Sequence, residues 1–166
     1  SGLRETVHPI VQQNTPTQIK IQGENINPED VISIAAGEDH TMILTRQGLF
    51  AFGYNQFGQL GTGDDVVQLN TPTQIQIQRQ NINPKDVISI TAGSYHNMIL
   101  TRQGLFAFGN NQFGQRGTGD DVVQHNTPTQ IKIQRENINP KDVIYITEGE
   151  NKTMIHTRHA IVICGE

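Results

Sequence analysis

The sequence lacks tryptophan, has a single cysteine and is poor in charged residues, which occupy 17% of its 166 positions. Because Cys164 has no second cysteine to pair with, an internal disulfide is excluded. This fits a reducing compartment, so we expect an intracellular protein, cytoplasmic or nuclear. No apolar run reaches the ~18 residues of a membrane-spanning helix, and no membrane partner is expected. The net charge of −4 makes nucleic acid an unfavourable partner for the surface as a whole.

Stretches of helical periodicity are absent as well. Glycine, with 16 residues, and the β-branched residues isoleucine, valine and threonine are abundant instead. This composition favours short strands joined by tight turns. A chain of 166 residues suffices for one compact unit that buries roughly 70% of its unfolded surface. We therefore expect an all-β protein.

The main positive feature is an internal repeat. The phrase Thr-Pro-Thr-Gln-Ile begins at Thr15, Thr71 and Thr127, an offset of 56 residues. Residues 15–70 and 71–126 are identical at 45 of 56 aligned positions, without a gap. A period of this size indicates a repeat architecture, in which each unit buries its apolar face against its neighbours.

The second copy predicts the secondary structure of one repeat. Strands are expected at 87–92, 96–101, 105–108 and 127–133, because β-branched and aromatic runs there end at glycine or turn residues. A short helical turn is expected to begin at Pro140. Four short antiparallel strands per repeat are typical of a β-propeller blade.

The whole chain then forms a single propeller-repeat domain, residues 1–166, with three blades' worth of strands. An N-terminal strand at 15–21 precedes repeats at about 31–86, 87–142 and 143–166, and the last repeat lacks its fourth strand. Propellers typically have four to eight blades, and an open arc exposes apolar blade faces. Two interpretations remain open: a fragment of a longer propeller, or a homo-oligomer, in which a homodimer forms a six-blade ring.

Two motifs recur within the repeats. Gly-x-x-His-x-x-x-Leu occupies 37–44 and 93–100, and Phe-Gly-x-Asn-x-x-Gly-Gln-Leu-Gly occupies 52–61. Gly63-Asp64 and Thr71-Pro72 follow. This order and spacing resembles the repeat of the regulator of chromosome condensation family, and the resemblance covers nearly the whole chain. It implies a β-propeller, usually of seven blades.

The functions that the resemblance implies are broad. Members of that family include a guanine-nucleotide exchange factor for the small GTPase Ran that docks on nucleosomes, ubiquitin-ligase domains, a plant ultraviolet photoreceptor, ciliary scaffolds and a bacterial β-lactamase inhibitor. A fold does not choose among them. The family often has tryptophan where this chain has Phe52, Phe108 and Cys164, so photoreception by a tryptophan cluster is excluded.

No catalytic residue, cofactor or metal site is predicted, and we do not expect an enzyme. His40 and His96 recur at matched positions and favour a structural role, with the imidazole bonded to neighbouring backbone groups. The third copy has Lys152 at this position. The pairs Asp64-Asp65 and Asp120-Asp121 follow a Gly-Thr-Gly turn and indicate a capping role, because a calcium loop alternates its oxygen ligands. Cys164 aligns with phenylalanine and is expected to be a buried apolar group.

The variable positions are the candidate site. Three matched loops between the first and second strands differ in every copy, while the flanking strands barely change. We predict a partner-binding rim made of Glu38, Asp39, Ser94, Tyr95, Glu150 and Asn151. Tyr95 is the best single contact residue, since tyrosine is favoured at binding hot spots. Neutral drift in exposed loops is the competing explanation.

Three functions follow from these observations. The first is a non-catalytic protein–protein interaction module built on the propeller. The second is a guanine-nucleotide exchange factor for a Ran-like small GTPase, although no insertion breaks the 56-residue rhythm to supply a wedge. The third is a self-assembling structural protein.

Overall fold

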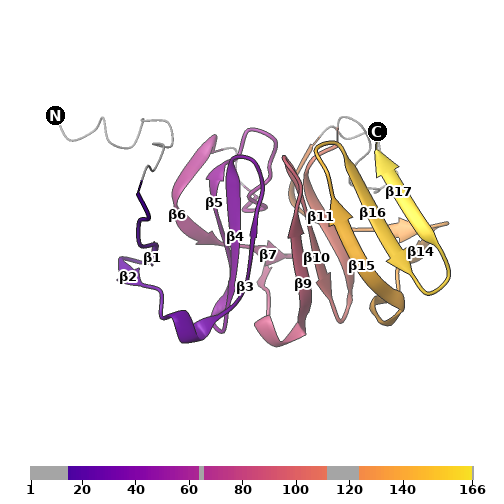
Figure 1. Ribbon diagram of the computed structural model, residues 1–166, viewed down its shortest axis with the longest axis horizontal. Helices are drawn as coiled ribbons and strands as arrows, with labels where there is room; N and C mark the ends of the chain where they lie inside the picture. Colours follow the sequence, from indigo (N-terminus) through magenta and orange to yellow (C-terminus); the bar gives the residue numbers. More distant parts are fainter. Residues whose placement is uncertain (1–14, 64–65, 112–123, 166) are drawn as a thin grey trace.

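The computed structural model describes residues 15–63, 66–111 and 124–165. In these ranges, three antiparallel sheets stand side by side in an arc, each contributed by one repeat (Figure 1). We call these sheets the first, second and third blades. None of the described helices is long and apolar enough to cross a membrane.

Each blade is a meander in which neighbouring strands in the chain are neighbours in the sheet. The first blade contains β3 (Val31–Ala36), β4 (His40–Thr45), β5 (Gly48–Tyr54) and β6 (Gln68–Gln74). The second contains β9 (Val87–Ala92), β10 (His96–Thr101), β11 (Gly104–Asn110) and β12 (Gln124–Gln130). The third contains β15 (Val143–Glu148), β16 (Lys152–Thr157) and β17 (Ile161–Gly165). The all-β fold of four-stranded antiparallel blades is confirmed.

The strands of the second blade match their sequence predictions closely, except for the fourth. We expected that strand at 127–133, whereas β12 ends at Gln130 and a separate two-residue strand follows. The N–H of Ile131 still donates to the carbonyl of Leu105 in β11 at 2.8 Å, and its side chain is buried in the core between the second and third blades. The separate strand β13 begins at the next residue.

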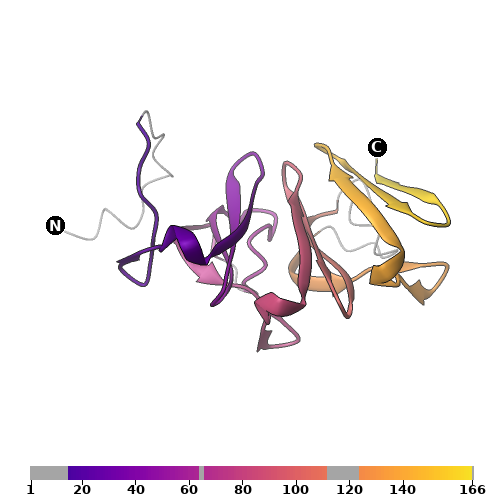
Figure 2. The same ribbon diagram turned by 60° about the horizontal axis from the view of Figure 1, so that its bottom comes forward.

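A two-strand hairpin and one turn of 3-10 helix precede each blade in the chain (Figure 2). The hairpins are β1–β2 (Lys20–Ile21, Glu24–Asn25), β7–β8 (Gln76–Ile77, Gln80–Asn81) and β13–β14 (Lys132–Ile133, Glu136–Asn137). The helical turns are η2 (Pro28–Asp30), η3 (Pro84–Asp86) and η4 (Pro140–Asp142). Proline opens each turn and the preceding asparagine caps it through its side-chain oxygen, as at Asn139. The predicted helical turn at Pro140 is confirmed.

The strand expected at 15–21 forms only in part. Of these residues only Lys20–Ile21 is a strand, and it pairs with β2 of its own hairpin. The matching segments of the later repeats, β6 and β12, hydrogen-bond to the third strand of their blade, β5 and β11 respectively.

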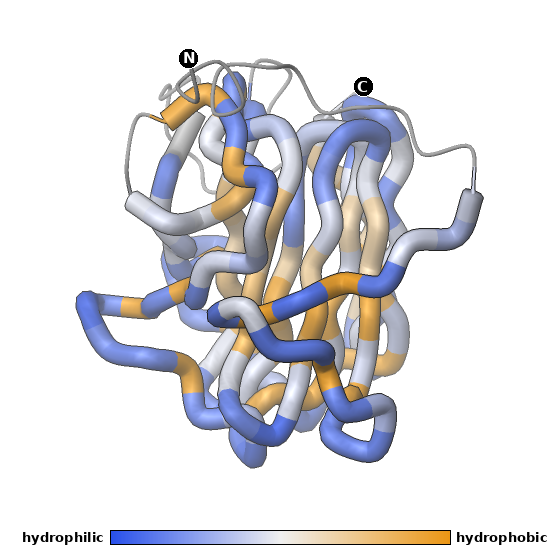
Figure 3. Tube along the Cα trace, turned by 90° about the vertical axis from the view of Figure 1, so that its left-hand side faces the viewer, coloured by the Kyte–Doolittle hydropathy of each residue, from blue (hydrophilic) through white to orange (hydrophobic). Residues whose placement is uncertain are grey.

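Apolar side chains on facing surfaces of neighbouring blades form two cores. The first core joins the first two blades and contains Met42, Leu44, Leu49, Ala51, Ile90, Ile99 and Phe108. The second core joins the last two blades and contains Met98, Leu100, Leu105, Ala107, Ile146 and Ile155. Figure 3 shows hydrophobic residues along the middle of the strands and hydrophilic residues in the loops at both ends. The side chain of Phe108 is fully buried in the first core.

The loop after β5 extends the first interface beyond the sheets. Leu60 belongs to the first core, and the α-carbon of Gly61 lies against the ring of Phe108 in the second blade. The carbonyl of Gln59 accepts a hydrogen bond from the side chain of Asn97 at 2.5 Å. The N–H of Gly63 donates to the carbonyl of Asn126 at 2.9 Å. One repeat therefore supplies part of the packing of the next blade.

Candidate protein-binding rim

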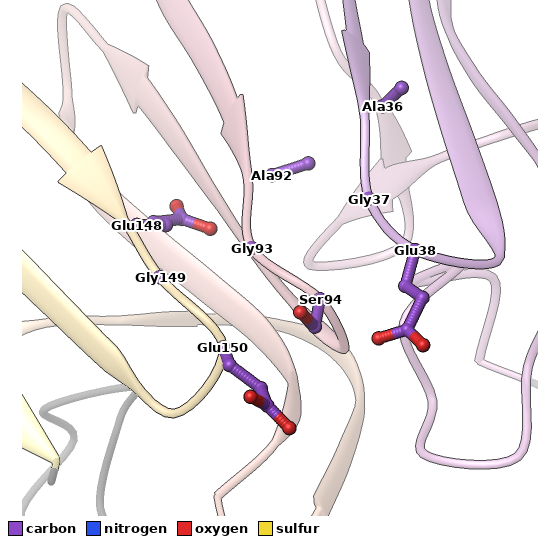
Figure 4. A pocket seen from close by; sticks show the side chains of 9 residues that line it. All are labelled: Ala36, Gly37, Glu38, Ala92, Gly93, Ser94, Glu148, Gly149 and Glu150. Carbon is purple, nitrogen blue, oxygen red and sulfur yellow. The ribbon is translucent and has the colours of Figure 1, made fainter.

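The three variable loops lie along one edge of the blade array. They follow β3, β9 and β15, and the N–H of Glu38 donates to the carbonyl of Ser94 at 3.3 Å, which joins the first two loops directly. An open pocket of about 330 Å³ runs across all three blades at this edge (Figure 4). Its lining takes three residues from each blade: Ala36, Gly37, Glu38, Ala92, Gly93, Ser94, Glu148, Gly149 and Glu150.

The structure thus brings Glu38, Ser94 and Glu150 around one pocket, while Asp39, Tyr95 and Asn151 occupy the next position of each loop. Glu38, Asp39 and Glu150 are exposed, and the other three are half-buried. Whether they bind a partner remains a prediction. Their common placement follows from repetition of one loop in three blades.

Identical backbone bonds shape the three loops. The glycine N–H donates to the carbonyl three residues later, from Gly37 to His40 at 2.9 Å and from Gly93 to His96 at 2.8 Å. The same bond joins Gly149 to Lys152 at 2.9 Å. The frame is therefore constant, and only the side chains that it presents differ.

The histidine of the motif requires the glycine. A β-carbon at Gly93 would meet the ring of His96 well inside van der Waals contact, and would lie 2.7 Å from the carbonyl oxygen of Gly149. The ring of His40 covers Gly37 in the same way. At Gly149 the nearest side-chain atom would be Cγ of Lys152, at 3.5 Å, which is ordinary contact. Only the two loops that carry histidine therefore exclude a side chain at the glycine.

His40 links the first two blades. Its Nε2 lies 2.7 Å from Oδ1 of Asn97, and both side chains are buried. Because the amide nitrogen of Asn97 donates to Gln59, Oδ1 is the acceptor and His40 carries its proton on Nε2. Burial lowers the pKa of His40, although the Asn97 bond and the charge of Asp39 oppose the shift. We expected imidazole bonds to neighbouring backbone groups; the partner is instead a side chain of the next blade.

His96 makes the matching link between the second and third blades, with an additional partner. Its Nε2 lies 2.9 Å from Oγ1 of Thr153 and 3.7 Å from Oε2 of Glu148. The side chains of His96 and Glu148 are both 0% exposed. Oε1 of Glu148 accepts a hydrogen bond from the hydroxyl of Thr91 at 2.6 Å. Burial raises the pKa of Glu148 to about 8, and the Thr91 bond opposes the shift.

Glu148 is the residue of this site that sequence reasoning missed. It aligns with Ala36 and Ala92, so the signal was available as a glutamate where two copies have alanine. The repeat pattern marks the substitution but does not show that the carboxyl lies between blades beneath the rim. That placement depends on the packing of β15 against β9.

Tyr95 lies at the centre of the acidic part of the rim. Its ring contacts that of Phe57 in a tilted arrangement, with ring centroids 5.0 Å apart. Desolvation raises the pKa of Tyr95, and a hydrogen bond with Glu38 and the charges of Glu38, Asp39 and Glu150 raise it further. Carboxylates of the first and third blades therefore act on a phenol of the second. The rim has negative potential and an aromatic surface.

The remaining candidates add little to this picture. Within the described ranges, no three His, Cys, Asp or Glu side chains are grouped to hold a metal ion. Asp64-Asp65 and Asp120-Asp121 lie outside the described residues. Cys164 is half-buried, and its burial raises the pKa of the thiol. His159 is exposed and lies 3.6 Å from Asp142.

Comparison with known proteins adds relatives to this geometry. The chain is 36% identical over 104 residues to the human X-linked retinitis pigmentosa GTPase regulator, which covers 61% of the chain and 10% of the relative. It is 30% identical over 147 residues to a bifunctional serine/threonine-protein kinase/NEDD4-like E3 ubiquitin-protein ligase of Dictyostelium discoideum, which covers 84% of the chain and 8% of the relative. It is 28% identical over 141 residues to human protein RCC2, which covers 84% of the chain and 26% of the relative. The chain thus spans about a quarter or less of the length of each of these relatives.

Solved structures agree on the fold. Prp20p from Saccharomyces cerevisiae superposes with a TM-score of 0.65 at 24% identity, over 92% of this chain and 34% of that chain. Human WBSCR16 superposes with a TM-score of 0.65 at 20% identity, over 90% of this chain and 40% of that chain. The regulator of chromosome condensation (RCC1) repeat matches residues 48–100 and 104–155, and a second description of the same repeat matches 31–59 and 87–115. With its motifs, its blades and these matches in agreement, the chain belongs to the RCC1 repeat family.

Proposed function

We propose that this chain is a non-catalytic protein-binding segment of a β-propeller, and that its partner docks on the rim of Glu38, Asp39, Ser94, Tyr95, Glu150 and Asn151. The observation that carries the proposal is the common pocket, which takes matched residues from all three blades. Variable loops on a constant frame suit recognition, because side chains can change without altering the scaffold. The half-buried aromatic pair of Tyr95 and Phe57 offers an anchor of the kind that dominates binding energy.

Site-specific cross-linking tests the rim. A photoreactive phenylalanine analogue is placed at Tyr95, at Glu38 or at Arg102, which is exposed in the turn between β10 and β11. We expect the same partner to cross-link from Tyr95 and Glu38 but not from Arg102. Capture should fall with Tyr95→Ala and with charge reversal at Glu38 and Asp39. A partner captured only from Arg102, or indifferent to all these changes, would contradict the proposal.

Nucleotide exchange is the alternative function. Yeast Prp20p, which shares the fold, binds Gsp1p and histones, and it has also been solved in complex with Kap60. A small GTPase is therefore a reasonable candidate partner for this chain. Nucleotide release from a Ran-like GTPase should be measured with micromolar protein. Faster nucleotide release would favour a function as an exchange factor. Unchanged release would favour a function as a non-catalytic binding module.

Self-association is a second property that a specific observation favours. Ile34 of the first blade is 68% exposed, whereas the matched Ile90 and Ile146 are 7% and 6% exposed because a preceding blade covers them. At the other end of the array, Ile161 and Ile163 are 65% and 62% exposed. These two end faces correspond to the two sides of the interface that the chain forms twice internally. A second copy can therefore pair with both and close a six-blade ring.

Molar mass in solution tests this pairing. A closed pair has about 37 kDa, twice the 18.4 kDa of the chain. Ile34→Asp should convert it to single chains, because a carboxylate would be buried without a partner. A monodisperse species of one chain in the unmodified protein would overturn the ring.

A further inference from the structure

The pocket of the rim differs between its two halves. Between the first and second blades its inner lining includes Ala36 and Ala92, whereas the third blade contributes Glu148 at the matched position. Figure 4 shows the carboxyl group of Glu148 extending from β15 towards Ala92 and Gly93 of the neighbouring blade. One half of the pocket therefore contains a carboxyl group that the other half lacks.

This carboxyl group is incompletely satisfied. Oε1 is bonded to Thr91, but Oε2 has no hydrogen-bond partner among the described residues, and the side chain is fully buried. When Glu148 is ionised, Oε2 is a buried acceptor without a donor, which destabilises that form. A donor that entered the pocket beside Glu148 would stabilise the ionised form, and so the site favours a ligand with N–H groups.

The surrounding charges favour a cation. Glu38 and Glu150 lie at the mouth of the pocket, on the first and third blades, and none of the lining residues is basic. Gly37, Gly93 and Gly149 line it without side chains, so a flat group can approach the backbone closely. The rings of Tyr95 and Phe57 stand beside this edge and suit a guanidinium, which stacks on aromatic faces.

Other groups facing Glu148 modulate this preference. His96 of β10 lies 3.7 Å from Oε2, Thr91 of β9 donates to Oε1, and Glu150 of the same loop adds negative charge. Lys152 begins β16 and is an exposed positive charge in the third blade. Two carboxylates at the mouth therefore outnumber the one nearby lysine, and the net charge around the pocket is negative.

We propose that the pocket binds an arginine side chain of a protein partner, held between Glu38 and Glu150 at the mouth and paired with Glu148 below. The inference rests on the proposed function only in taking the ligand to be part of a protein. A cation next to a carboxyl group favours its ionised form. Because Glu148 is largely protonated at neutral pH, arginine binding releases a proton from it.

Calorimetric titration with a capped hexa-arginine peptide tests the pairing. Titrations at pH 7 in two buffers of different ionisation enthalpy give both the affinity and the number of protons released. The unmodified protein should bind and release a proton. Glu148→Gln keeps the size of the side chain but cannot ionise, and should bind about tenfold more weakly with no proton release.

The matched control is Glu136→Gln, which removes one exposed carboxylate from the β13–β14 hairpin and should leave affinity and proton release unchanged. Glu150→Gln should weaken binding while proton release persists, which keeps the test valid if Glu148→Gln fails to fold. Equal losses in Glu148→Gln and Glu136→Gln would overturn the proposal, as would absence of binding. Equal affinity for hexalysine would overturn the assignment to guanidinium.

The outcomes also separate this inference from the function proposed above. If hexa-arginine fails to bind while cross-links from Tyr95 still identify a partner, the arginine site is wrong and the rim stands. If hexa-arginine binds as expected but no partner cross-links from Tyr95 or Glu38, the pocket stands and the rim function is wrong.

Discussion

The two blade interfaces are built from nearly the same sequence but differ in how they handle buried polar groups. Between the first and second blades, His40 and Asn97 form a linear chain of bonds that ends on the carbonyl of Gln59. Between the second and third blades, His96 bonds to Thr153 and also faces Glu148. The first interface has alanine, Ala36 and Ala92, at the two matched positions, whereas the second has a buried carboxyl group at Glu148.

The difference shows that a repeat protein can assign separate tasks to equivalent contacts. Eight apolar core positions recur at both interfaces, from Met42 and Met98 to Ile99 and Ile155, whereas Leu60 and Phe108 belong to the first core alone. Glu148, in place of alanine, gives the second interface a carboxyl group whose pKa is raised to about 8 by burial.

The glycine of the rim loops should show the largest contrast. Gly93→Ala places a β-carbon against His96 and the carbonyl of Gly149, and should lower the free energy of unfolding by more than about 3 kcal/mol. Gly149→Ala has room, and should change it by less than about 0.5 kcal/mol. Urea denaturation of the two variants measures both values. Equal losses would mean that the histidine ring does not control the loop.

The second-largest expected effect is a pH dependence of stability that comes from Glu148 in the second interface. The pKa of Glu148 is raised from 4.5 to about 8 in the folded protein, so the folded state holds a proton that the unfolded state has lost. Stability from this group is full below pH 4.5 and is lost as pH rises towards 8. We expect a decrease of roughly 3–4 kcal/mol between pH 5 and pH 8 from this group.

Thermal unfolding at pH 5, 6.5 and 8 measures this effect in matched variants. Glu148→Gln should flatten the dependence and raise Tm at pH 8, because a neutral amide fills the same space. Glu136→Gln should keep the slope of the unmodified protein. An unchanged slope in Glu148→Gln would show that another group titrates.

The polar links themselves should contribute less. Asn97→Ala leaves both the Nε2–H of His40 and the carbonyl of Gln59 without their partner, and should cost about 2 kcal/mol. Thr153→Ala removes one hydroxyl from His96 and should cost about 1 kcal/mol. Chemical denaturation compares the two. A larger loss of stability in Thr153→Ala than in Asn97→Ala would show that the first interface is not the more strongly hydrogen-bonded of the two.

Tyr95 should have the smallest effect on stability. Its ring is half-buried and contacts Phe57, so Tyr95→Ala should cost less than about 1 kcal/mol while it reduces partner capture. Tm and cross-linking yield measured on the same preparation separate the two effects. A large fall in Tm would make Tyr95 a structural residue.

Sequence reasoning reached most of the fold because local signals and the repeat agree. The β-branched runs at 87–92 and 96–101 and the proline at Pro140 fix their elements with short-range chemistry. It missed the end of β12 at Gln130, where the side chain of Ile131 enters the core between the second and third blades.

The candidate site shows the same division. Aligned copies identify the loops of Glu38, Ser94 and Glu150, because variation within a repeat is visible in the sequence. The burial of Glu148 and its approach to His96 are not visible, because they depend on how far β15 lies from β10 across the interface. Electrostatic properties of such a site arise between repeats, and a single repeat does not contain them.

The loop that carries Gln59, Leu60 and Gly61 has a consequence for how this molecule would come apart. It is encoded with the first blade but packs on Asn97 and Phe108 of the second. Separating the two repeats would expose Asn97 and Phe108 in the second blade, and it would leave the loop of the first without the surface that it packs on. The smallest fragment that keeps this contact therefore contains two neighbouring repeats.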